Sequence, residues 1–252
     1  ALVNPGIAKL KGNQTLIAPD DVLENTVTTL YFDVIIVTDN GWEIKNQLFF
    51  EDYKNLNENA YGFSQFHDAW VIEEKLVLAK VFQGENLTTS LQISPSIRHT
   101  DFKHGDDFFN EYFHRRDLTK TSTSLDRRVL STRIDDDYST YDVGEYTDIG
   151  IAVLADFTWN SGLSVLAGIR HDSIDIESKT PQDKLIFPDG IPQADDTVSG
   201  TSWTFSVSYD SPIGLIPYIT ASEQATLVAG QGANIDAPTI LAGNAFDTSE
   251  LL

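Results

Sequence analysis

Residues 87–98 alternate between apolar and polar side chains with almost no interruption. Apart from Thr89, every second residue from Leu87 to Ile97 is apolar, and the residues between them are Thr, Ser, Gln and Arg. Because successive side chains of a β-strand point to opposite faces, this pattern predicts a strand with one apolar and one polar face. The apolar face is stabilised by contact with an apolar environment, whereas the polar face can be exposed to water.

The same alternation returns along the chain and predicts about eight strands. They are expected at residues 26–38, 42–56, 65–82, 87–102, 149–159, 163–172, 203–209 and 215–226. Residues 68–82 also fit an amphipathic helix, but a strand is preferred because residues 83–86 then form a tight turn into the next one. Residues 227–252 are rich in Gly, Ala and Asn and are expected to form a loop.

The connections between these strands alternate between short and long. Asn40-Gly41 is a strong hairpin signal, whereas residues 103–144 and 179–198 lack sustained alternation. A loop of about 40 residues is unusual in a compact soluble domain. Long loops on one side and short turns on the other are typical of transmembrane β-barrels. The sequence therefore predicts an all-β fold, a segment of an antiparallel up-and-down transmembrane β-barrel.

Composition excludes several classes of protein. A net charge of −21 argues against binding to nucleic acid. The absence of Cys excludes disulfides and thiolate metal sites. No run approaches the roughly 18 apolar residues of a spanning helix, so a membrane role would depend on strands. Because the 252 residues contain no Met, we expect a section of a longer protein.

Two consecutive segments resemble a known family. Residues 146–151 followed by 163–172 resemble the mid-barrel strands of TonB-dependent outer-membrane receptors, with Gly168, Arg170 and Asp172 in the family's positions. His171 replaces the usual Tyr. Residues 217–223 resemble a later strand of the same barrels, although positions 217 and 221 depart from its pattern.

The resemblance implies a barrel of about 22 strands that is closed by an N-terminal plug domain. Residues 1–252 would then be a partial barrel domain without the plug. Receptors of this family import scarce nutrients across the outer membrane of Gram-negative bacteria, using energy passed on by the TonB complex. The implied partners are a ferric siderophore or similar metal chelate, the TonB complex through the plug, and outer-membrane lipid. Ferric siderophores are favoured because they dominate the family's substrates.

The loop 103–144 contains a cluster that suits such a ligand. Aromatic rings and guanidinium groups can stack on a flat anionic chelate and donate charge-assisted hydrogen bonds to it. The candidate ligand-binding residues are Tyr112, His114, Arg115 and Arg116. The alternative is that neighbouring carboxylates, such as Asp106 and Asp117, pair with these groups and anchor the loop.

Other polar clusters predict no resident cofactor. Residues of metal-ligand type gather at His99, Asp101, His104, Asp106 and Asp107, but their spacing matches no standard metal site. The acidic run 135–137 lacks the spaced ligands of a calcium loop. Arg170 and Asp172 are expected to face the lumen as part of a charged wall.

The sequence does not predict an enzyme, since it has neither a Gly-x-Ser-x-Gly motif nor a phosphate-binding Gly loop. Three other interpretations stay open. A passive porin-like channel would need about 16–18 strands and no plug. A soluble β-sandwich binding module would bury both apolar faces in one core. A self-contained eight-stranded barrel would have to close on itself.

Overall fold

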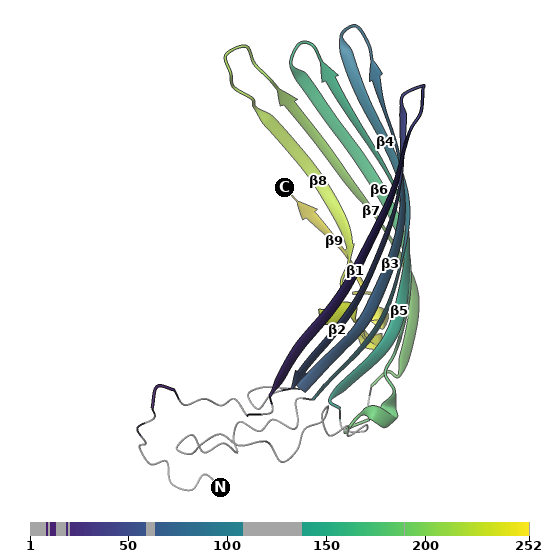
Figure 1. Cartoon of the computed structure of the whole chain (residues 1–252), viewed down its shortest axis with the longest axis vertical. Coiled ribbons are helices and arrows are strands. Elements are labelled where there is room, and N and C mark those ends of the chain that lie inside the picture. The colour runs from purple at the N-terminus through teal and green to yellow at the C-terminus, as the bar shows by residue number, and fades with distance from the viewer. Residues whose placement is uncertain are drawn as a thin grey trace.

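The computed structural model describes residues 9, 11–13, 19, 21–58, 64–107, 138–188 and 190–251. These residues form one antiparallel sheet of nine strands in sequence order (Figure 1). The strands are β1 (Val22–Val37), β2 (Trp42–Glu58), β3 (Ser64–Gln83), β4 (Leu87–Asp107), β5 (Thr140–Trp159), β6 (Leu163–Lys179), β7 (Gln193–Tyr209), β8 (Tyr218–Leu227) and β9 (Phe246–Leu251). The fold is therefore the predicted up-and-down β arrangement.

Within the described residues, three short helical segments accompany the sheet: η2 (Gln182–Lys184), η3 (Gln231–Ala233) and α2 (Ala237–Leu241). The start of α2 is capped by Asp236, whose Oδ1 accepts a hydrogen bond of 2.7 Å from the backbone N–H of Thr239. Pro238 stands in the first turn, where its missing N–H costs no helical hydrogen bond. In the described part of the chain, no helix is long and apolar enough to span a membrane.

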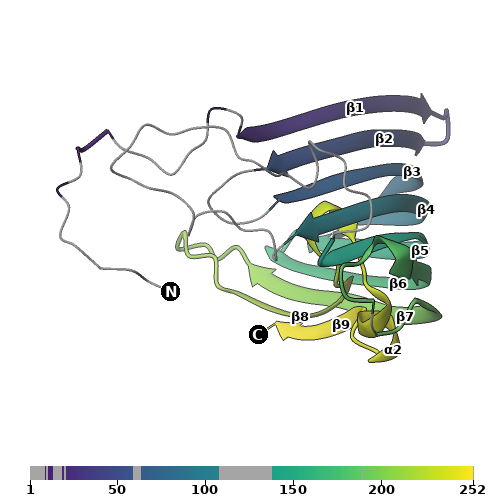
Figure 2. The same ribbon diagram turned by 90° about the horizontal axis from the view of Figure 1, so that it is seen from below.

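The pairing register sorts the side chains onto two faces. Between β4 and β5 it runs without slippage from Leu87 opposite Trp159 to Asp106 opposite Thr140. Odd-numbered residues of β4, such as Ile93 and Ile97, share the convex face, and even-numbered residues share the concave face. In the part of the chain that the structure describes, the sheet is a single curved layer, so its convex face is not packed against a second sheet (Figures 1 and 2). A β-sandwich, which requires two packed sheets, does not describe this fold.

Among the described residues, the larger of two buried clusters lies on the concave face, where residues 228–245 fold back against the sheet. Both η3 and α2 contact the strands there: η3 contacts β3 and β4, and α2 contacts β6 and β7. The buried core residues are Ala69, Phe102, Tyr146, Ile174, Ile176, Ala194, Ile235, Ala237, Ile240 and Ala245. This core therefore serves only the half of the sheet that lies away from the short turns.

Several predicted boundaries were wrong, most of them on the side of the long connections. The exception is the eighth strand, which was expected from residue 215 but begins at Tyr218, after the short turn. Residues 103–107 belong to β4 and residues 140–144 to β5, although both were expected in a loop. Strand β7 begins at Gln193, inside the expected loop 179–198. The expected C-terminal loop contains α2 and β9. Outward side chains such as Asp101 and Glu145 are charged there, so the strands continue by backbone pairing after the apolar alternation has ended. Residues 68–82 are a strand, as preferred.

Candidate functional site

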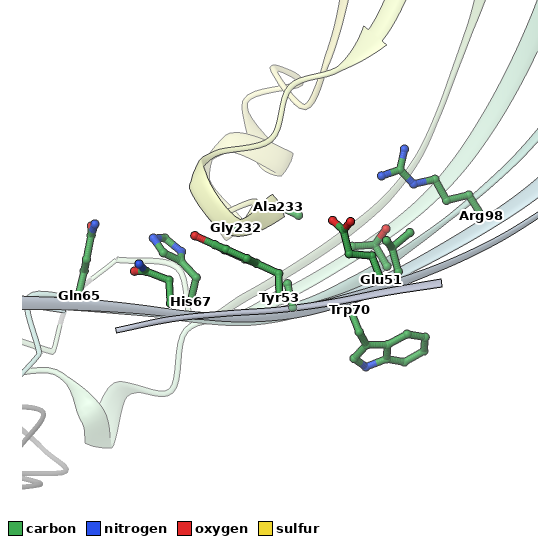
Figure 3. A pocket seen from close by; sticks show the side chains of 12 residues that line it. Glu51, Tyr53, Gln65, His67, Trp70, Arg98, Gly232 and Ala233 are labelled. Carbon is green, nitrogen blue, oxygen red and sulfur yellow. The ribbon is translucent and has the colours of Figure 1, made fainter. Parts of the chain in front are cut away.

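The concave face carries a cavity of about 450 Å³ between β2, β3, β4 and η3 (Figure 3). The register places the lining side chains of these strands on the concave face, as with Tyr53 opposite Ala69. Trp70 is the exception, because its ring points to the convex side (Figure 3). The polar residues that line the cavity are Glu51, Tyr53, Asn55, Gln65, His67, Arg98 and Thr100.

Strand β1 fixes the side chains of β2 that enter this cavity. Glu51 Oε2 accepts a hydrogen bond of 3.0 Å from Thr29 Oγ1, across the register pair that joins the two strands. The Tyr53 hydroxyl donates to Asn25 Oδ1 at 3.3 Å. Asn55 Nδ2 donates to the same oxygen at 2.8 Å. The cavity wall formed by β2 is therefore hydrogen-bonded in place by its neighbour.

The buried imidazole of His67 lines the cavity next to η3, and the buried imidazole of His104 stacks on it. The rings of His67 and His104 stack with centroids 4.3 Å apart and an interplanar angle of 10°. Nδ1 of His104 lies 3.0 Å from the carbonyl oxygen of Phe66, which assigns the proton to Nδ1 because a carbonyl only accepts. Nε2 of His104 lies 3.4 Å from Asp106 Oδ2. This side of the cavity is thus a fixed polar surface.

Gly232 of η3 lies directly against His67. A Cβ atom at this position would stand 2.5 Å from His67 Nδ1, and the backbone has a φ of +64°. Only glycine accommodates both the contact and this left-handed backbone conformation without strain. The close approach of η3 to the sheet, and with it the shape of the cavity, therefore depends on this residue.

Arg98 stands between this cavity and a second one of about 420 Å³ that is lined by Asp148, Arg170 and Asp172. Arg170 Nε donates to Asp172 Oδ2 at 2.8 Å, and its Nη2 lies 3.9 Å from Asp148 Oδ2. Arg170 and Asp172 therefore form the predicted charged wall. Arg98 is exposed on the same face, where its guanidinium group can donate hydrogen bonds to an anionic oxygen ligand.

The four predicted ligand-binding residues, Tyr112, His114, Arg115 and Arg116, lie outside the described residues, as does the acidic run 135–137. The group of metal-ligand type on β4 is divided between faces, because His99 and Asp101 point to the convex side while His104 and Asp106 point to the concave side. Among the residues that the structure describes, no group of three or more His, Cys, Asp or Glu side chains could hold a metal ion.

The sequence matches the family described as TonB dependent receptor-like, beta-barrel, over residues 5–247. The chain belongs to this family. The comparison with curated proteins found no match.

Solved structures of such receptors share the fold. The ferric citrate transporter FecA has a TM-score of 0.67 at 8% identity, with 91% of this chain and 32% of that chain covered. The siderophore receptor PiuA from Acinetobacter baumannii has a TM-score of 0.63 at 14% identity, with 92% and 37% covered. The ferric-catecholate import receptor Fiu from Escherichia coli K12 has a TM-score of 0.64 at 11% identity, with 89% and 37% covered. This TonB-dependent receptor chain thus spans about a third of the length of these structures.

Membership of the family identifies the solvent on each face of the sheet. TonB-dependent receptors are outer-membrane β-barrels, so the apolar part of the convex face contacts lipid and the concave face lines the barrel interior. Both cavities therefore open to the interior. Sequence reasoning placed Arg98 on the polar face of its strand but missed the cavities, since these depend on how residues 228–245 fold back.

Proposed function

We propose that this chain forms part of the barrel wall of a receptor that imports a ferric siderophore across the outer membrane of a Gram-negative bacterium. The observation that carries the proposal is the family match over residues 5–247. The names of the structural neighbours, a ferric citrate transporter, a siderophore receptor and a ferric-catecholate import receptor, support this substrate class. In this proposal residues 1–252 are one partial barrel domain, and an N-terminal plug couples the receptor to the TonB complex.

The concave face suggests how such a ligand is held. Siderophore complexes of iron commonly present anionic oxygens, which a guanidinium group recognises through charge-assisted hydrogen bonds. Arg98 is exposed and lines the cavity of about 450 Å³, together with the phenol of Tyr53 and the imidazole of His67. We propose that these side chains form an inner contact, and that Tyr112, His114, Arg115 and Arg116 of the connection between β4 and β5 form an outer one.

Uptake of radioactive iron by iron-starved cells tests the function. Cells with the full-length receptor should accumulate iron supplied as ferric citrate or as a ferric catecholate, and deletion of the receptor should abolish this uptake. A strain without TonB should lose the uptake as well. Uptake that persists without TonB would instead support the passive porin-like channel. Unchanged uptake of every chelate after deletion of the receptor would contradict the proposed function.

The inner contact has its own test. Replacing Arg98 by Gln removes the positive charge but keeps hydrogen-bond donors, so the chelate concentration for half-maximal uptake should rise about tenfold, the equivalent of roughly 1.4 kcal/mol. Arg98→Lys keeps the charge, so its chelate concentration for half-maximal uptake should lie between those of the unmodified receptor and of Arg98→Gln. Lys179→Gln is a matched control, because Lys179 is the last residue of β6 and points to the convex side. Equal effects of the Arg98 and Lys179 variants would exclude Arg98 from ligand binding.

A further inference from the structure

The hairpin turn between β7 and β8 differs from the other short turns. It consists of residues 210–217, with the sequence Asp-Ser-Pro-Ile-Gly-Leu-Ile-Pro. Its Ile213, Leu215 and Ile216 are 79%, 63% and 62% exposed. The turns at 38–41, 84–86 and 160–162 contain only Thr, Asp, Asn, Gly, Glu and Ser. All four turns lie at the same end of the sheet (Figure 1), yet only this one presents aliphatic side chains.

Backbone hydrogen bonds hold these aliphatic side chains at the tip. The N–H of Tyr209 donates to the carbonyl of Pro217 at 3.1 Å, and the N–H of Ser211 donates to the carbonyl of Leu215 at 3.0 Å. The Ser211 hydroxyl closes the turn by donating to the same carbonyl at 2.7 Å. Gly214 supplies the positive φ of +81° that the tight reversal requires. The exposed apolar tip is therefore built into a hydrogen-bonded hairpin.

The tip continues the apolar band of the convex face. Val207 pairs with Ile219, and the hydrogen bond from Ser211 to Leu215 keeps the same register. Because side chains alternate along each strand, Leu215 and Ile219 share the convex face with Val207. Ile216 and Tyr218 alternate with them and point to the concave side. The outward apolar surface thus runs without a charged residue from Val207 and Ile219 to the tip.

We propose that this hairpin tip is a lipid anchor: Ile213 and Leu215 insert into the bilayer interface at the turn side of the barrel, while the other three turns stay in water. The occupant is lipid because the tip is continuous with the convex face, which contacts lipid in this family. Exposed aliphatic side chains at the edge of such a face extend the buried apolar area of an interfacial contact. The proposal does not depend on which nutrient the receptor imports.

Single-cysteine labelling tests the anchor, because the 252 residues contain no native Cys. The full-length receptor carrying Leu215→Cys, with any Cys outside this segment replaced by Ser, is labelled with an environment-sensitive fluorophore and reconstituted into phosphatidylethanolamine–phosphatidylglycerol vesicles. Brominated acyl chains should quench this label, and aqueous iodide should not. Ser161→Cys, in a polar turn, is the matched control and should show the opposite behaviour.

Ile216→Cys separates lipid contact from burial in general, since it neighbours Leu215 but points to the concave side. Its label should be quenched by brominated chains at most half as strongly as the label at 215. Iodide quenching at 215 as strong as at 161 would place the tip in water and overturn the anchor. Protection from both quenchers at 215 would show that protein covers the tip, which also overturns it. Because all three substitutions are at exposed turn positions, each variant is expected to fold.

Discussion

The two ends of the sheet use the same strands in two different environments. Near the short turns, four neighbouring register partners form an apolar row on the convex face across β4, β5, β6 and β7. They are Ile93, Val153, Ile169 and Trp203. Eight residues further along β4, the equivalent row reads Asp101, Glu145, Glu177 and Asp195. A row of four carboxylates cannot face hydrocarbon, so the second row lies where the sheet has left the bilayer.

The concave face differs between the two ends as well. Beyond the apolar band, residues 228–245 cover the concave side and form the buried core around Phe102 and Ile240. Near the turns no described segment covers that side, and the sheet is a single layer. The bilayer stabilises one end from outside, whereas a folded-back loop stabilises the other from inside. Substitutions at the two ends should therefore have unequal effects.

The largest effect is expected in the core beyond the band. Phe102 is 0% exposed, so Phe102→Ala leaves a cavity and should cost about 3–5 kcal/mol of unfolding free energy. Ile97→Ala, on the same strand but on the convex face, should reduce the unfolding free energy far less. The reason is that Ile97 is 47% exposed and its truncation leaves no enclosed cavity. Urea unfolding of the full-length receptor in vesicles measures both. Equal costs would break the contrast between the two ends.

Gly232→Ala should loosen the folded-back segment without affecting the strands near the turns. The added Cβ would stand 2.5 Å from His67 Nδ1, and the left-handed backbone adds strain, for a total cost of about 2–3 kcal/mol. Hydrogen exchange should speed up in residues 228–245 and stay slow in the hairpin of β5 and β6. Gly243→Ala is the control, because its φ of +72° is similar while nothing lies within 4 Å. Equal exchange in the two variants would mean that contact with His67 is unimportant.

Arg170→Gln tests the charged wall between the two ends. The Arg170 side chain bonds to Asp172 and Ser96 and is 33% exposed, so solvent reduces the cost to about 1–2 kcal/mol. The exposed pair of Lys179 and Glu177 is the comparison, and Lys179→Gln should change stability much less, because solvent screens an exposed ion pair. Unfolding midpoints at low and high salt measure both. A similar loss for the two variants would show that the wall network adds no more than an exposed pair.

The sequence predicted the end of the sheet near the turns better than the other end, for a physical reason. In the bilayer every second side chain must be apolar, so Leu87, Leu91 and Ile93 reveal the strand and its faces. Beyond the bilayer both faces accept polar residues, as at Asp101 and His104, and the strand continues only through backbone pairing. Alternation therefore ends before the strand does.

The cavities were beyond sequence reasoning because they form between distant segments. Arg98 could be assigned to the interior from its strand position alone. Its relation to η3 depends on the contact of Gly232 with His67, which is 165 positions away in sequence (232 − 67) and leaves no periodic signal. By contrast, the predicted ligand residues at 112–116 were chosen for their chemistry and stay a prediction.

The smallest effect is expected at the edge between the two environments, where Trp203 lies at the end of the apolar row. Its Nε1 donates to Glu223 Oε2 at 2.8 Å on the convex face, and the side chain is 38% exposed. Trp203→Phe removes this hydrogen bond but keeps an aromatic ring at the interface, so the cost should be about 0.5–1 kcal/mol. Glu223→Gln keeps an acceptor oxygen and should cost less. A loss for Trp203→Phe as large as for Phe102→Ala would mean that Trp203 is packed against protein, and the apolar convex face would then not be the lipid-facing side in this region.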